Sequence, residues 1–294
     1  MAESTSDRKS FFSTLRGKKT ESGAEMSFFD HIEELRWHLV RSVIVFVCCA
    51  AVIFIYKDWV YDHIILAPAQ AGFVTYSALC RLGHWLHIGD AFCMPPVQIN
   101  LQVNTVNGTF TSALSIATIG GLILSFPFIV WEIWKFIKPA LSAKEIRNAR
   151  GGIFWVSFFF FCGASFGYYL LAPFTYNFLA TFTLGTTGMT KYYPSITDYI
   201  DSLTSVVLGC GLGFEMPIIA YVLANIGIIN GAFLKRYFKF AFVLILVIAG
   251  IITPSPDWMT QLFVAIPLTI LYLISIVLAN RVEKQKEKVE KEWS

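Results

Sequence analysis

Residues 39–56 read Leu-Val-Arg-Ser-Val-Ile-Val-Phe-Val-Cys-Cys-Ala-Ala-Val-Ile-Phe-Ile-Tyr, an apolar run in which Arg41 is the single charged residue. The hydrocarbon core of a membrane is about 30 Å thick, and a helix needs about 20 apolar residues to cross it. The run therefore predicts a transmembrane helix. Five further apolar stretches follow along the chain, at residues 113–134, 153–172, 203–229, 240–252 and 258–279. Together they predict an all-α integral membrane protein with six transmembrane helices.

The composition of the whole chain supports this class. Hydrophobic residues make up 55% of the 294 residues, and charged residues only 15%, where about 25% is usual for soluble proteins. Such a composition excludes both a soluble globular protein and a disordered chain. The net charge of +3 gives no indication of nucleic-acid binding. Phosphate-binding loops, zinc-protease motifs and hydrolase nucleophile motifs are absent from the sequence, so we expect no enzyme, no cofactor and no metal.

The distribution of Lys and Arg predicts how the helices are oriented. Segments 1–36, 135–150, 235–239 and 281–291 together hold 19 of these residues, and the alternate loops hold three. Because basic residues gather on the cytoplasmic side, both termini are expected to be cytoplasmic. The predicted organisation is a basic polar tail at 1–25, a six-span membrane domain at 26–280 with a long external loop at 57–112, and a charged cytoplasmic tail at 281–294. Proline residues in or beside the spans predict bent helices that form a concave scaffold.

The external loop carries two local patterns. Apolar and polar residues alternate over 97–104, which is typical of a half-buried strand. Cys80 and Cys93 share the loop, where oxidising conditions permit a disulfide. His84 and His87 lie between them, so a Cys2His2 metal site is the alternative. The spacing matches no structural zinc pattern, and we therefore favour the disulfide.

Glu215 is the acidic residue that is hardest to explain as a structural residue. It lies near the middle of the 203–229 span, where an isolated charge costs at least about 2.5–3.5 kcal/mol. Gly209 and Gly213 permit another helix to come close, and the bend expected at Pro217 would leave the carboxyl group open toward lipid. The alternative is a buried acid with a structural partner. Glu132 lies nearer the cytoplasmic end of its span, where a charge costs less.

Two further groups of acidic residues lie at predicted cytoplasmic helix starts. Glu33 and Glu34 follow Asp30 at the beginning of the first helix, where they can pair with Arg36 or Arg41. Glu145 comes three residues after Ser142, which is the spacing of a helix capping box. From the residues alone, local pairing and capping explain these acids as well as a binding role does.

Four motifs, in order along the chain, resemble those of the TatC family, the core membrane subunits of the twin-arginine protein translocase. They are His-Ile-Glu-Glu-Leu-Arg at 31–36, Ser-Phe-Pro at 125–127 with Trp-Lys-Phe-Ile-Lys-Pro-Ala-Leu at 134–141, Gly-Phe-Glu-Met-Pro at 213–217 and Thr-Pro-Ser-Pro-Asp at 253–257. The resemblance covers residues from about 27 to 279.

The resemblance implies a function and a location. Members of this family sit in the bacterial inner membrane and bind signal peptides that carry two consecutive arginines. They move folded proteins across the membrane with the single-span partners TatA and TatB, driven by the protonmotive force, and they assemble as oligomers with these partners.

The resemblance also implies roles for individual residues. Glu34, Glu145, Arg36 and Phe136 match family positions that bind the signal peptide. Glu215, Gln261 and Asp257 match positions that contact the partner helix. Glu132 stands where many relatives carry Gln, and no family role carries over to the long external loop.

Two other functions remain open from the sequence alone. A proton-coupled small-molecule transporter would use Glu132 and Glu215 as a proton relay. It would usually show internal repeats, and none is visible. A structural assembly factor is the second alternative, and it would have no need of acidic residues at the cytoplasmic membrane edge.

Overall fold

The structure is a computed structural model that describes residues 28–70, 72–85, 87, 93, 101–138, 151–181, 193–253 and 258–293. Side chains are described for these residues except at 28–32, 82, 259 and 289–293. The chain divides into two units, residues 1–37 and residues 38–294. In the first unit the described residues form the opening turns of helix α2 (Phe28–Ile55), and all other described elements belong to the second unit.

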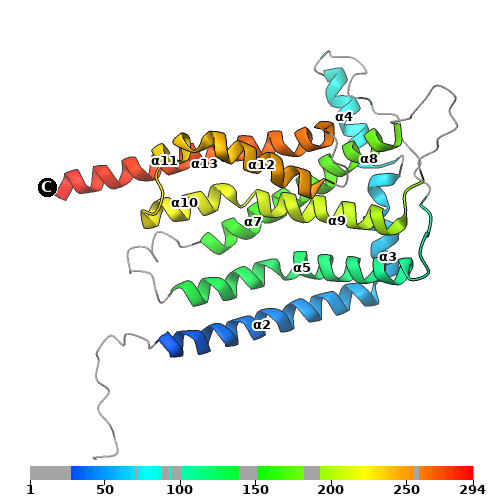
Figure 1. The fold of residues 1–294 in the computed structure, drawn as a ribbon, viewed down its shortest axis with the longest axis horizontal. Coiled ribbons are helices and arrows are strands. Elements are labelled where there is room, and N and C mark those ends of the chain that lie inside the picture. The colour runs from blue at the N-terminus through cyan, green and yellow to red at the C-terminus, as the bar shows by residue number, and fades with distance from the viewer. Residues whose placement is uncertain are drawn as a thin grey trace, which may run out of the picture. The chain divides into compact units, whose positions relative to one another are not determined.

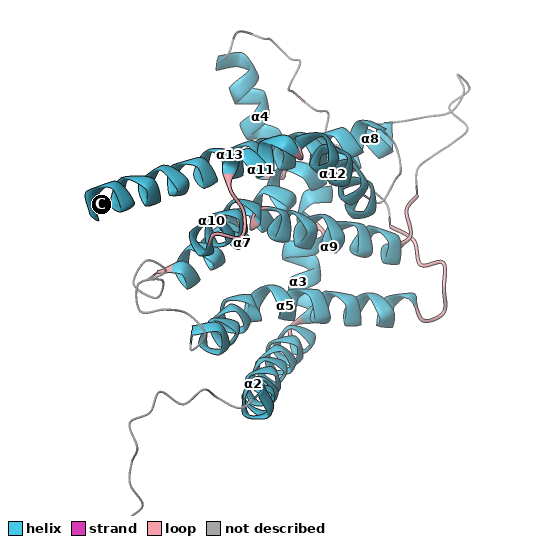
Figure 2. Ribbon diagram, turned by 60° about the vertical axis from the view of Figure 1, so that its left-hand side comes forward, coloured by secondary structure: helices cyan, strands magenta, loops and turns pink. Residues whose placement is uncertain are grey.

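The described part of the second unit is helical almost throughout (Figures 1 and 2). After α2 come α3 (Lys57–Val60), the short π-helix η1 (Tyr61–Ile65), the 3-10 helix η2 (Ala67–Ala69), α4 (Val74–Trp85), α5 (Gly108–Ile137), α7 (Gly152–Phe166), the short π-helix η5 (Gly167–Leu171), α8 (Ala172–Thr181), α9 (Ile196–Gly213), α10 (Met216–Ile226), α11 (Gly231–Arg236), α12 (Phe238–Ile252) and α13 (Trp258–Trp293). The charged C-terminal residues thus continue α13 as a helix.

Six helical stretches in the described ranges are long and apolar enough to cross a membrane. They are Glu33–Ile55, Lys57–Trp85, Gly108–Ile137, Gly152–Thr181, Ile196–Ile226 and Thr260–Lys288. Five of them coincide with predicted spans, so the all-α class with six long apolar helices is confirmed. The set nevertheless differs by one member, because the predicted span at 240–252 forms α12, which has only 15 residues.

The additional long apolar stretch, Lys57–Trp85, lies where the sequence predicted a loop. It is not one straight helix, since Gln70 has an extended backbone (ψ 144°) between η2 and α4. The wide turn η1 is capped by tyrosines from other helices: Tyr168 donates its hydroxyl to the carbonyl of Ile64 (2.7 Å), and Tyr199 donates to that of Ile65 (2.7 Å). These hydrogen bonds satisfy backbone carbonyls that would be costly to leave unpaired in an apolar environment.

The strand predicted over 97–104 is wrong for the part that the structure describes. Over residues 101–104 there is one isolated parallel bridge, between Gln102 and Ser195. The amide of Gln102 donates to Pro194, and the amide of Ile196 donates back to Gln102 (3.1 and 3.0 Å). Among the described residues, this segment pairs only with the short stretch before α9, and the pairing does not extend beyond the one bridge.

Helix α9 is the centre of the packing. It lies alongside α7 and α5, and α10, which continues from it, lies alongside α13 (Figure 1). One apolar cluster surrounds Tyr199, Ile200 and Leu203 on the first half of α9, and a second surrounds Val206 and Cys210 farther along the helix. Both clusters are buried, so α9 contributes to two of the three apolar clusters of the described residues.

The contact between α7 and α9 depends on two glycines. A Cβ atom on Gly163 would lie 2.5 Å from the carbonyl oxygen of Cys210, and one on Gly167 would lie 3.0 Å from that of Val206. The Gly-x-x-x-Gly pattern that runs from α7 into η5 therefore lets the two backbones touch, which is how small residues hold helices together in membranes. The interpretation of this pattern as helix packing is confirmed.

We predict that Gly163→Ala destabilises the protein by about 1–3 kcal/mol, because the added methyl group meets backbone atoms that cannot move aside. Gly152→Ala is the matched control on the same helix, since a Cβ there has nothing within 4 Å. The control substitution should leave stability unchanged or raise it by up to about 1 kcal/mol through helix propensity. Thermal unfolding of both purified variants in one detergent measures the difference. Equal midpoints would contradict the close packing at Gly163.

Candidate functional site

The residues expected to bind a signal peptide fall in different parts of the chain. Glu34 lies on the opening turns of α2 and is half-buried, and Arg36, also on these turns, is exposed. Phe136 lies in the last turn of α5 and is half-buried. Glu145 is outside the described residues. The assignment of these four residues to one binding site therefore stays a prediction.

Glu132 of α5 is the centre of a charged network. Its side chain is only 2% exposed, and each carboxylate oxygen has a partner. His38 Nδ1 lies 2.6 Å from Oε2, and Lys135 Nζ donates to Oε1 at 2.9 Å. Arg41 adds a longer contact, with Nη1 3.9 Å from Oε2. The network joins α2 to α5 through a carboxylate that is satisfied on both sides.

Aromatic rings complete the surroundings of this network. Lys135 Nζ lies 3.9 Å above the ring of Trp131, a cation–π contact, and the ring of Phe136 meets that of His38 edge-on at 6.3 Å. Glu132 is the buried charge of this network, and a buried charge left without any partner typically costs about 3–5 kcal/mol. Glu132 is therefore held as a structural brace between two helices, and its oxygens are not open to a mobile ligand.

Glu215 has the opposite environment. Helix α9 ends at Gly213, Phe214 and Glu215 form a turn, and α10 starts at Met216 with Pro217 as its second residue. The proline thus follows a break in the predicted span, as its missing amide requires. The Glu215 side chain is buried, and its Oε1 has no hydrogen-bond partner among the described residues.

The expectation that Glu215 faces lipid openly is wrong. Only 6% of the residue is exposed, because α7 packs onto α9 as far as Phe214 and α13 packs along α10. A buried carboxyl oxygen without a partner can still take a hydrogen bond from a polar group that is brought to it. The break between α9 and α10 therefore holds a buried acceptor, Glu215 Oε1, that has no partner among the described residues.

Of the other two residues expected at a partner contact, the structure describes Gln261, which lies in the first turn of α13. Gln261 is half-buried, and its Nε2 donates to the carbonyl of Leu246 on α12 (2.8 Å). This bond ties α13 to α12. Asp257 lies outside the described residues. Among the described residues, Gln261 is bonded to Leu246 and Glu215 Oε1 has no partner, so the two side chains do not share a hydrogen bond at this oxygen.

The two loop cysteines are joined. Cys80 of α4 and Cys93 form a disulfide with their Cα atoms 4.3 Å apart. His84 lies one turn farther along α4, and its Nδ1 is 3.9 Å from the Cys80 sulfur. His87, which the sequence placed in the same group, does not belong to this cluster in the structure.

Sequence reasoning missed two polar features. The partner of Glu132, His38, is 94 residues away, and only Lys135, three residues along the same helix, gave a local signal. The second feature is an open cavity of about 280 Å³ where α9 passes the end of α12. It is lined by Asp198, Asp201, Ser202, Ser205, Ile251, Ile252 and Thr253. The acids recur at helical spacing on α9, but nothing in that pattern shows that the end of α12 lines the same cavity.

Three comparisons with known proteins bear on this arrangement. The family model described as Sec-independent protein translocase protein (TatC) matches residues 30–267. A protein of that name from Blattabacterium is 38% identical over 263 residues, which cover 89% of this chain and 98% of the relative. The protein of the same name from Helicobacter pylori strain 26695 is 39% identical over 184 residues, covering 62% of this chain and 70% of the relative.

Solved structures agree with the sequence relatives. A crystal structure titled Twin Arginine Translocase Receptor TatC superposes with a TM-score of 0.68 at 30% identity, and the match covers 86% of this chain and 99% of that one. A second, in the detergent DDM, gives a TM-score of 0.69 at 29% identity, with 85% of this chain and 99% of that one covered. A family match over most of the chain and a shared fold lead to one conclusion: this chain belongs to the TatC family of Sec-independent protein translocase proteins.

Proposed function

We propose that this chain is the receptor subunit of a twin-arginine translocase in the bacterial inner membrane. It binds signal peptides with two consecutive arginines, and it moves folded proteins across the membrane with partners of the TatA and TatB type, driven by the protonmotive force. The observation that carries the proposal is the likeness to a crystallised twin-arginine translocase receptor, which covers 86% of this chain. Oligomers with these partners are part of the proposal.

The proposed signal-peptide site consists of Glu34, Glu145, Arg36 and Phe136. Its chemistry depends on the two carboxylates, because a guanidinium group binds carboxylate oxygens through two parallel hydrogen bonds. The position of Glu34 at the start of α2, ahead of the apolar part of that helix, supports this assignment. Such a residue is reached from the aqueous side of the membrane edge.

The proposed partner contact is centred on Glu215, with Gln261 and Asp257 as its further members. Two features of the structure support it: the buried Oε1, which has no hydrogen-bond partner in the described part of the chain, and the break in the helix directly before Met216. A polar group on a partner helix would give Glu215 Oε1 a hydrogen-bond partner, which is how polar side chains hold helices together in membranes.

A proton relay between Glu132 and Glu215 has less support. Both oxygens of Glu132 are already bonded to His38 and Lys135, so the residue is a brace in this fold. We therefore assign no transport step to Glu132.

The domain organisation and orientation also belong to the proposal. We propose a cytoplasmic tail at 1–25, a membrane domain at 26–280 with the 57–112 segment outside, and a cytoplasmic tail at 281–294. The alternative topology is that Lys57–Trp85 crosses the membrane and α12 does not. That topology would place the segment 139–150 on the external side.

Reporter fusions distinguish the two topologies. We predict cytoplasmic signals after Ser142, Lys235 and Glu292 and external signals after Gly89, Thr187 and Ser255, because the 135–150 segment holds five Lys and Arg residues and the 57–112 segment only two. A cytoplasmic signal at Gly89 together with an external one at Ser142 would overturn the proposed orientation.

For the signal-peptide site we predict that Glu34→Ala and Glu145→Ala each weaken signal-peptide binding about tenfold or more. A charge-assisted hydrogen bond contributes about 1.5–3 kcal/mol, and about 1.4 kcal/mol corresponds to a factor of ten. Binding of a labelled twin-arginine peptide to the purified variants measures the effect. Glu33→Ala is the matched control, since Glu33 is an exposed neighbour on the same turns and should bind as wild type does. Unchanged binding in the Glu34→Ala/Glu145→Ala double variant would remove both residues from the site.

For the partner contact we predict that Glu215→Gln retains most cross-linking to a TatA- or TatB-type helix and that Glu215→Ala loses it. Gln can still donate and accept hydrogen bonds at this position, whereas Ala cannot. Photo-cross-linking from Leu212, which is exposed beside the break, reports the contact, and signal-peptide binding should survive in both variants. Undiminished cross-linking and export with Glu215→Ala would show that Glu215 is only a buried structural acid.

A further inference from the structure

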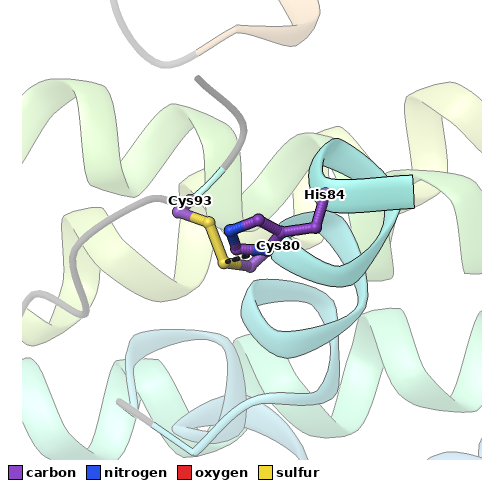
Figure 3. Close-up of side chains that lie close together, drawn as sticks. All are labelled: Cys80, His84 and Cys93. Atoms are coloured by element: carbon purple, nitrogen blue, oxygen red, sulfur yellow. Dashed lines mark hydrogen bonds between the residues drawn. A yellow bond between two sulfur atoms is a disulfide. The ribbon is translucent and has the colours of Figure 1, made fainter. Parts of the chain in front are cut away.

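Among the residues that the structure describes, one group of three metal-ligating side chains gathers at the end of α4. It consists of Cys80, His84 and Cys93, whose ligand atoms all lie within 4.8 Å of one another (Figure 3). Cys80 and His84 are one helical turn apart, so both project from the same side of α4. Cys93 comes from the chain that follows, with its Cα 4.3 Å from that of Cys80.

The donors suit a soft, tetrahedral cation. Zinc binds thiolate sulfur at about 2.3 Å and imidazole nitrogen at about 2.0–2.1 Å, so neighbouring ligand atoms in a tetrahedral site lie roughly 3.3–3.8 Å apart. The Cys80 sulfur and His84 Nδ1 are 3.9 Å apart, close to that spacing. Two thiolates would also neutralise the charge of Zn²⁺, which leaves the neutral imidazole and one water molecule as the remaining ligands.

The cluster is reachable from solvent. His84 is exposed and both cysteines are half-buried, so an ion has a path to the sulfur atoms. His87 has a positive φ of 56° in the turn after α4, and its backbone amide donates to the carbonyl of His84. The structure therefore divides the two histidines, with His84 inside the cluster and His87 outside it.

We propose that Cys80, His84 and Cys93 form a Zn²⁺ site when the disulfide is reduced, so that Cys80 and Cys93 close this loop by a covalent bond in one state and, together with His84, by a metal in the other. A dithiol reductant supplies two electrons and two protons, becomes a disulfide itself, and leaves Cys80 and Cys93 as thiols. Zn²⁺ then displaces the two thiol protons and binds both sulfurs and His84. The disulfide excludes the metal, since it occupies both sulfur atoms. This inference is independent of the signal-peptide proposal.

The test uses the full chain purified in detergent. One half is reduced with dithiothreitol and freed of it anaerobically, and the other half is left oxidised. Both are titrated with Zn²⁺ against a chromogenic chelator, and with Co²⁺ to detect the charge-transfer absorption of thiolate–cobalt bonds. We expect one tightly bound Zn²⁺ per reduced chain, thiolate–cobalt absorption from the reduced chain alone, and no tight binding by the oxidised chain.

Three variants make the test specific. His84→Ala should lower Zn²⁺ affinity about 100-fold or more. Loss of a residue that only hydrogen-bonds to a metal ligand lowers metal affinity about 10–100-fold, and loss of the ligand itself should cost more. His87→Ala is the matched control and should bind as the wild type does. Cys80→Ser/Cys93→Ser should bind no tight Zn²⁺ although it keeps the four other cysteines. Equal Zn²⁺ binding by reduced wild type and the double cysteine variant, or by wild type and His84→Ala, would overturn the proposal. Gel filtration of each sample confirms that the chain remains folded.

Discussion

The contact of backbone against backbone where α7 crosses α9 supports the rest of this structure. Lipid is as apolar as the helices themselves, so burial alone gives little reason for helices to associate in a membrane. The helices are instead held together by van der Waals contact at short range. Gly163 and Gly167 permit this contact because they leave room for the carbonyls of Cys210 and Val206. Once α9 is fixed, its Tyr199 caps the irregular turn at Ile65, and its C-terminal end sets the position of Glu215.

The two buried glutamates of the membrane spans differ in their hydrogen-bond partners. Glu132 is bonded by His38 and Lys135 and so holds α2 against α5. Glu215 lies at a helix break, and one of its oxygens has no partner in the described part of the chain. A charge at membrane depth is tolerated only when it is paired or when it serves a function. The contrast supports a structural role for Glu132 and a role in partner binding for Glu215.

Much of the fold could be predicted because a membrane demands long apolar helices, and a run such as 39–56 shows its length and polarity directly in the sequence. The Pro217 break and the Gly163 packing were likewise local signals. The predictions failed where contacts between residues far apart in the sequence determine the local structure. Alternation over 97–104 could not show that the described residues 101–104 meet the segment before α9 in a single bridge. The polar residues within 57–85 concealed helices whose irregular turns are capped by distant tyrosines. Neither the bond between His38 and Glu132 nor the separation of His84 from His87 is visible without the fold.

The central claim, that this chain is a receptor for twin-arginine signal peptides, is tested most directly by peptide discrimination. Two fluorescent signal peptides, identical except that one carries two consecutive arginines and the other two lysines, are titrated with the purified full chain in detergent. A guanidinium group can form paired hydrogen bonds with a carboxylate and an ammonium group cannot. The arginine peptide should therefore bind about tenfold more tightly or better, a difference of about 1.4 kcal/mol or more. Equal affinity for the two peptides, or no binding of either, would contradict the claim.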